Sequence, residues 1–218
     1  MSFLTTLNTC CEAYADFSYD GHSIQLPYRL GGKKTPDEIR AAISTWAGSF
    51  RKTATQIQKY VAGHQDKTGI DCSGLVYYVL NEASSGAVRA YFEEKLNKHG
   101  LLNYRYGISA SNLTNSAYGT KITMANDIKP GCVMRSNGGK HVLVIRSVNR
   151  DPVGNVTSIA YIHSNGSKGP HHATIAIGDP SKDLNDSKQK WNDIAYSDAK
   201  AKRLYDYTLL LTPIAELV

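Results

Sequence analysis

The stretch 69–80 carries a cysteine at the point where a polar segment becomes apolar. It reads Gly-Ile-Asp-Cys-Ser-Gly-Leu-Val-Tyr-Tyr-Val-Leu, and the helical spacing of its apolar residues predicts a largely buried helix with Asp71 as N-cap and Cys72 on the first turn. Unpaired backbone N–H groups and the positive end of the dipole at a helix start favour thiolate over thiol. We therefore expect a lowered pKa and a nucleophilic thiol at Cys72. The alternative is a structural role, because free cysteines are often buried as small apolar residues.

Two histidines lie where they could activate that thiol. A thiol nucleophile requires a base within hydrogen-bond reach and a third group that orients the base. His141 opens an apolar strand directly after the Gly138-Gly139 turn, and His163 ends the next strand. If the two strands pair through a turn at 151–154, the start of one lies beside the end of the other. The pattern then predicts neighbouring imidazoles at one edge of a sheet.

The elements that must position these residues change in type along the chain. Helical patterns occupy 2–15, 35–47, 49–62, the cysteine segment and 85–99, and the clearest start is the Thr35-Pro36-Asp37-Glu38 capping box. The segment 103–120 has no firm period and is expected to be a loop. Short apolar segments bounded by turns follow at 131–135, 141–148, 156–163, 173–177 and 204–211. Helices followed by strands predict an α+β fold of one domain, 1–218, with the cysteine helix packed against an antiparallel sheet.

Composition and charge restrict the class of protein. The chain has 218 residues, 41% hydrophobic and 20% charged, with a net charge of +6, which is typical of a globular protein with an anionic partner. No cluster of lysine or arginine indicates nucleic acid. The apolar runs are too short for membrane insertion, and the first residues do not form a signal peptide, so we expect synthesis in the cytoplasm. The four cysteines, at 10, 11, 72 and 132, form neither a disulfide framework nor a CxxC zinc pattern.

Several motifs in the same order carry a family resemblance. Asp-Cys-Ser-Gly-Leu-Val at 71–76, a Pro-Gly turn at 130–131, Gly-Lys-His-Val at 139–142, Ile-His-Ser at 162–164 and Tyr-Arg-Leu-Gly-Gly at 28–32 together resemble the NlpC-type papain-like cysteine peptidases. That family hydrolyses the stem peptides of bacterial peptidoglycan. The resemblance implies a papain-like (NlpC-type) fold and covers roughly 27–32 and 69–177.

The resemblance also implies a role for individual residues. Cys72 would be the nucleophile, His141 the general base that later protonates the leaving amine, and His163 the group that orients His141. Tyr28 and the backbone N–H of Cys72 would stabilise the oxyanion, a contribution that is usually large. No metal or other cofactor is implied.

Substrate binding is implied for the two residues that flank the nucleophile. Asp71 and Ser73 would contact the peptide near the cleaved bond. In this sequence, however, three features depart from the family pattern. The segment 33–68 forms a helical insertion, Cys132 stands where the family usually has aspartate, and His163 lies farther from the base than is common, so that His171 or His172 could take its place in a different hairpin register.

The expected function is that of a cysteine endopeptidase acting on peptidoglycan stem peptides, between D-glutamate and the diamino acid as the resemblance implies. The chain shows no export signal and no wall-binding module. We therefore expect an antibacterial effector delivered to the target-cell periplasm by a type VI secretion system, or a phage lysin. An effector implies two partners, an immunity protein and a carrier of the secretion apparatus.

Two other functions stay open. Enzymes related to lecithin:retinol acyltransferase use the same kind of thiol for acyl transfer or for cleaving amides outside the wall. A catalytically inactive wall-binding module is the alternative from another class, and the complete set of Cys72, His141 and His163 argues against it. Alkylation of Cys72 at neutral pH faster than that of the other cysteines would indicate an activated thiol.

Overall fold

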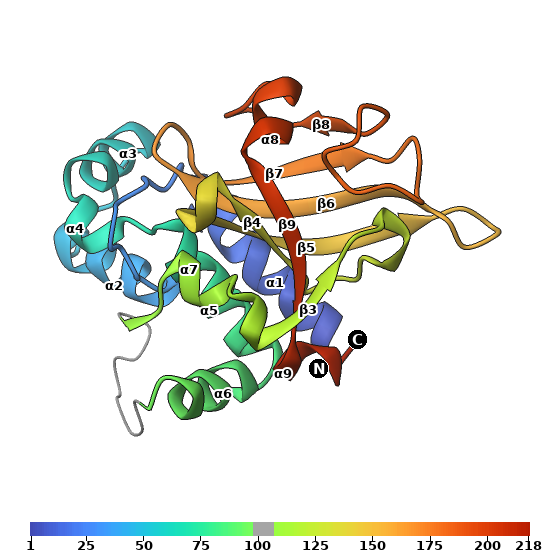
Figure 1. Ribbon diagram of the computed structural model, residues 1–218. Helices are drawn as coiled ribbons and strands as arrows, with labels where there is room; N and C mark the ends of the chain where they lie inside the picture. The colour runs from blue at the N-terminus through green and yellow to red at the C-terminus, as the bar shows by residue number, and fades with distance from the viewer. Residues whose placement is uncertain (98–106) are drawn as a thin grey trace.

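The computed structural model describes residues 1–97 and 107–218. Within these residues the main sheet has seven strands in the order β3-β9-β4-β5-β6-β7-β8, and neighbouring strands run antiparallel. The strands are β3 (Gly119–Ile122), β4 (Val133–Ser136), β5 (His141–Arg150), β6 (Val156–Asn165), β7 (Gly169–Ala176), β8 (Lys190–Asn192) and β9 (Tyr205–Leu211). Figure 1 shows this sheet with helices α1 and α5 along one side of it.

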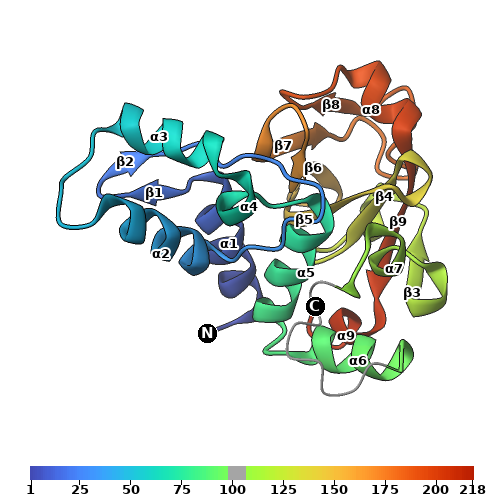
Figure 2. The same cartoon turned by 90° about the vertical axis from the view of Figure 1, so that its left-hand side faces the viewer.

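The helices form two groups around the sheet. Their bounds are α1 (Phe3–Ala15), α2 (Pro36–Ala47), α3 (Ala54–Gly63), α4 (Gln65–Thr68), α5 (Cys72–Ala83), α6 (Ala87–Lys95), α7 (Ala110–Leu113), α8 (Asp198–Leu204) and α9 (Thr212–Ala215). Helices α2 and α3 lie to one side of the sheet, together with the small hairpin of β1 (Ser18–Tyr19) and β2 (His22–Ser23) (Figure 2). We call α2, α3 and α4 the helical lobe.

The central strands are buried on both faces. In β5, Val142 and Val144 belong to the core that includes α1 and α5, whereas Leu143 and Ile145 belong to a second core on the opposite face. Trp191 of β8 lies in that second core. Because a strand alternates its side chains between faces, a run of apolar residues such as 142–145 fits a sheet covered on both sides.

The nucleophile helix is fixed by its own burial. Helix α5 begins at Cys72, and the Oδ1 of its N-cap Asp71 accepts a hydrogen bond from the Gly74 N–H at 2.6 Å. The first five residues of the helix, 72–76, are all buried. Since nearly every side of α5 contacts protein, the core and not a flexible loop determines where the thiol lies.

The α+β class and most expected elements are confirmed. Helix α3 begins later than the expected residue 49, because Thr53 and Gln56 form a capping box that starts the helix at Ala54. Strand β7 begins at Gly169, earlier than expected. The expected loop contains the short helix α7, and the part of the chain over 98–106, which includes the expected end of the 85–99 helix, lies outside the described residues.

No helix in the described ranges is both long enough and apolar enough to cross a membrane.

Candidate active site

The segment 27–33 lies alongside residues 69–71, immediately before the nucleophile helix. The backbone N–H of Asp71 donates to the Gly32 carbonyl oxygen at 2.9 Å. A Cβ on Gly32 would stand 2.5 Å from the Gly69 carbonyl oxygen, so the two segments approach this closely only with glycine at position 32. This pairing brings the Tyr-Arg-Leu-Gly-Gly motif against the start of α5.

A buried charged network holds that pairing. The Nζ of Lys33 donates to the Oδ1 of Asp71 at 2.8 Å and also to the Oγ of Ser73. The N–H of Gly31 donates to the other carboxylate oxygen at 3.0 Å. Asp71 and Ser73 are each 5% exposed, and the protein's own donors occupy both oxygens of Asp71. Contact of Asp71 or Ser73 with substrate stays a prediction.

Tyr28 lies beside the thiol. Burial, followed by the nearby Cys72 and Asp71, raises the pKa of Tyr28 to about 12. The phenol therefore keeps its proton at neutral pH and can donate a hydrogen bond. Within the described ranges, no protein group is assigned as a hydrogen-bond partner of this hydroxyl.

The thiol of Cys72 lies next to the first residues of β5. It is 6% exposed, and burial raises its pKa, while the backbone N–H of Val142 and the charge of Lys33 act in the opposite direction. The expectation of a lowered pKa at the helix start is therefore wrong for this structure, because desolvation outweighs the favourable contacts. The contact with the Val142 amide places the sulfur beside the residue that follows His141.

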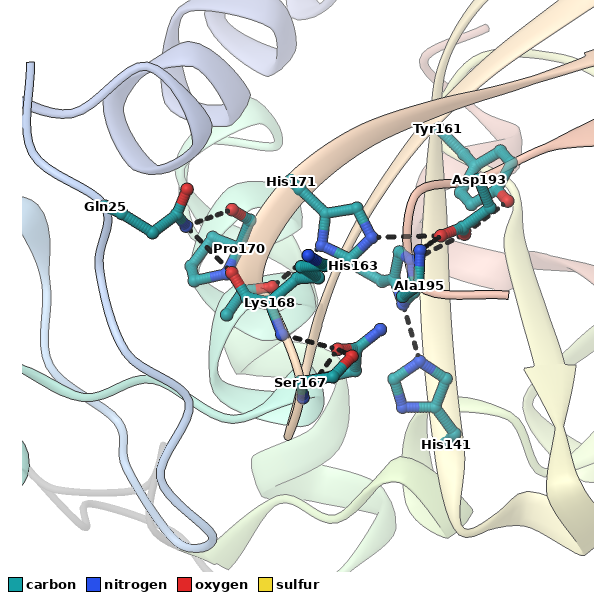
Figure 3. Close-up of polar contacts among 12 residues, drawn as sticks. Gln25, His141, Tyr161, His163, Ser167, Lys168, Pro170, His171, Asp193 and Ala195 are labelled. Carbon is teal, nitrogen blue, oxygen red and sulfur yellow. Dashed lines mark hydrogen bonds and ion pairs between the residues drawn. The ribbon is translucent and has the colours of Figure 1, made fainter. Parts of the chain in front are cut away.

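His141 and His163 are neighbours, as expected from the hairpin. The Nε2 of His141 and the Nδ1 of His163 are 2.8 Å apart, and the Nε2 of His163 is 2.9 Å from the Oδ2 of Asp193 (Figure 3). A carboxylate only accepts, so the Nε2 of His163 carries a proton and its Nδ1 accepts from His141. His141 then has its Nδ1 unprotonated, which is the state that a general base requires.

Asp193 was not expected as part of the site. It follows β8, its side chain is fully buried, and it accepts from the Tyr161 hydroxyl at 2.8 Å and from the Ala195 N–H at 2.7 Å. Burial alone would raise the pKa of this carboxyl, but the hydrogen bonds from His163 and His171 outweigh it and hold the pKa well below its ordinary value. Asp193 is thus a carboxylate that anchors the histidine chain.

His171 supports Asp193 and does not replace His163. Its Nδ1 is 2.9 Å from the Gly169 carbonyl oxygen and its Nε2 is 3.2 Å from the Oδ1 of Asp193. A carboxylate only accepts, so the Nε2 of His171 donates to Asp193, and His171 is a second imidazole that holds this carboxylate in place. His172 points to the other face of β7, where its Nε2 is 3.1 Å from the Oδ2 of Asp16.

The ligand atoms of His163, His171 and Asp193 lie within 4.8 Å of one another and form the one candidate metal group in the described ranges. A metal ion there would have to displace the Nε2 protons of both imidazoles. The arrangement of donors and acceptors fits a hydrogen-bonded network, in which each proton has an acceptor.

Acid should destabilise the protein through His141. Burial lowers the pKa of His141 to about 3 from 6.5, so between those values the unfolded chain binds a proton that the native state does not. The stabilising contribution of His141 should therefore be complete above pH 6.5. As the pH drops toward 3, the free energy of unfolding should fall by a few kcal/mol, on the order of one kcal/mol for each pH unit. Urea unfolding of the wild type and of His141→Asn at pH 7, 6 and 5 measures this contribution.

The variant should show a smaller loss of stability between pH 7 and pH 5 than the wild type does. Every other titrating group, including the buried His163, is common to both proteins, so the difference reports His141 alone. Equal losses in the two proteins would contradict a neutral, buried imidazole at this position.

Comparison of the chain with family models, with curated proteins and with solved structures finds no match.

Proposed function

We propose that this chain is a cysteine amide hydrolase with a papain-like arrangement of its site. Cys72 is the nucleophile, His141 the general base, His163 the group that orients His141, and Asp193 the anchor of the chain. One observation carries the proposal: a hydrogen-bonded series runs from Asp193 through His163 to His141, and the next residue, Val142, contacts the Cys72 thiol through its backbone N–H. This series supplies the base and the orienting groups that a thiol nucleophile needs.

The reaction follows from the assigned protons. The Nδ1 of His141 takes the proton of the Cys72 thiol as the sulfur attacks the carbonyl carbon of the amide. The same proton then passes to the leaving nitrogen, the C–N bond breaks, and a thioester remains on Cys72. Water attacks the thioester while His141 takes a proton from it, and that proton returns to the departing sulfur. The imidazolium that forms in each step is stabilised through His163 by the Asp193 carboxylate.

The negative charge on the carbonyl oxygen needs donors in each tetrahedral intermediate. The backbone N–H of Cys72 is unpaired within its own helix because it belongs to the first turn. The Tyr28 hydroxyl is a second donor beside the sulfur. In other acyl-transfer enzymes, loss of one such donor costs on the order of 100-fold or more in kcat.

The substrate class that we propose is the stem peptide of peptidoglycan, cut between D-glutamate and the diamino acid. Two observations support this substrate class. The motifs around Tyr28, Cys72, His141 and His163 resemble those of NlpC-type peptidases, and the helix that carries the cysteine packs against an antiparallel sheet. The net charge of +6 suits an anionic wall polymer. We further propose an antibacterial effector, delivered to the target-cell periplasm by a type VI secretion system and neutralised by an immunity protein.

Mass spectrometry of purified peptidoglycan fragments tests the proposal. The fragments are incubated with the wild type and, in parallel, with Cys72→Ala. We expect new fragments only with the wild type, and their masses identify the bond. If fragments stay uncut while the Cys72 thiol is still alkylated fast, the thiol acts on another acyl group, as an acyltransferase would. If Cys72 is unreactive as well, the chain is an inactive binding module.

A further inference from the structure

A pocket of about 540 Å³ opens between the helical lobe and the turn that joins β6 to β7. Tyr28, which lies beside the nucleophile, and Ile194, which follows Asp193, both line it. Its other walls come from residues 25–27, from α3 and α4, and from the turn residues 166–169. The pocket is therefore continuous with segments of the candidate active site.

We propose that this pocket binds a substrate residue that carries a free carboxylate, and that Lys168 is the cation that recognises it. The inference rests on the proposed function and deepens it, because it specifies an acidic peptide as the substrate class. The stem peptide contains such carboxylates next to the proposed bond.

The charge of the pocket favours an anion. Lys168 is the one charged residue among the described lining residues, and the others with polar side chains are neutral glutamines, a serine and Tyr28. The ion pairs formed by the described carboxylates do not include Lys168. An entering carboxylate therefore meets an ammonium that no internal acid neutralises.

The backbone that carries this lysine is held in place from two sides. The Nε2 of Gln25 donates to the Lys168 carbonyl oxygen at 2.8 Å and to the Pro170 carbonyl oxygen at 3.2 Å (Figure 3). The N–H of Lys168 donates to the Oδ1 of Asn165 at 3.0 Å. The side chain of Lys168 is exposed, but these hydrogen bonds hold its backbone at the rim of the pocket.

The helical insertion forms one wall of the same pocket. Gln58 of α3 pairs with the backbone of Gln25 through two hydrogen bonds of 2.9 Å, one accepted and one donated by its side-chain amide. Gln25 in turn binds the Lys168 carbonyl, so the insertion is tied to the turn that carries the lysine. We infer that the segment 33–68 serves to enclose this subsite.

A series of synthetic stem peptides tests the inference: one peptide has every carboxylate free, and each of the others has a single carboxylate replaced by its amide. Each amidated peptide forms a pair with the free form. For one of these pairs the wild type should cleave the carboxylate form at least tenfold better in kcat/KM, mainly through a lower KM. Lys168→Gln should remove this preference and treat both peptides as the wild type treats the amide. Lys168→Glu should reverse it.

Lys67→Gln is the matched control, because Lys67 is an exposed lysine of α4 that does not line the pocket. It should keep the wild-type preference. Cleavage that persists with an unchanged preference in Lys168→Gln would overturn the subsite and leave the hydrolase standing. Absence of cleavage of every peptide by the wild type would overturn both.

Discussion

Replacing His141 with alanine is expected to lower kcat for cleavage of a stem-peptide amide by about 10³- to 10⁴-fold. Burial raises the pKa of the Cys72 thiol, so without the imidazole no neighbouring group takes the proton as the sulfur attacks. The leaving amine also loses its acid. Steady-state kinetics with a defined stem peptide measure the loss.

Alkylation of the four cysteines provides a second measurement on the same proteins. Burial is the largest effect that raises the pKa of Cys10 and Cys132 to about 11 and that of Cys11 to about 12. In the wild type Cys72 should react fastest with iodoacetamide, because His141 assists its ionisation. His141→Ala should slow Cys72 alone, and the other three rates serve as internal controls.

His172→Ala is the matched histidine control, since His172 contacts Arg146 and Asp16 on the other face of β7. It should leave kcat within about threefold of the wild type, as expected for a partly exposed residue outside the site. A kcat for His141→Ala within tenfold of the wild type would show that another group acts as the base.

Replacing Asp193 with alanine is expected to reduce both stability and activity. The change removes the acceptor of His163, His171 and Tyr161 and leaves three buried donors without it. Each buried donor that is left without an acceptor costs about 1–3 kcal/mol. Urea unfolding at pH 7 measures the loss in the free energy of unfolding.

Asp193→Asn separates the catalytic from the structural effect. The asparagine fills the same space, but its amide nitrogen cannot accept from an imidazole N–H, and the negative charge behind His163 is gone. In serine-protease triads the same exchange lowers kcat by about 10⁴-fold, and we expect a loss of at least about 100-fold here, with less destabilisation than in Asp193→Ala. If kcat stays within threefold of the wild type, Asp193 is purely structural.

Local patterns predicted much of the framework. The N-cap role of Asp71 and the capping box at Thr35 could be predicted because capping depends on residues three positions apart. The proximity of His141 and His163 followed from one hairpin, since pairing two adjacent strands fixes which ends meet. The α+β class followed from the change in hydrophobic period along the chain.

Asp193 could not be predicted in this way. Its side chain contacts His163, which lies 30 positions earlier in the sequence, and it follows a strand of three residues within a turn-rich stretch that has no clear period. The raised pKa of Cys72 could not be predicted either, because the burial that raises it comes from elements packed around the helix start and not from the helix itself. Both depend on tertiary contacts that no short sequence pattern encodes.

Detection of the acyl-enzyme tests the central claim most directly. The wild type is mixed with a stem peptide, quenched in acid within the first turnover, and measured by intact mass spectrometry followed by peptide mapping. We predict an added mass equal to the acyl part of the cleaved peptide, attached to Cys72 and absent from Cys72→Ala. Turnover without any adduct on Cys72, or turnover that survives in Cys72→Ala, would contradict the proposed nucleophile.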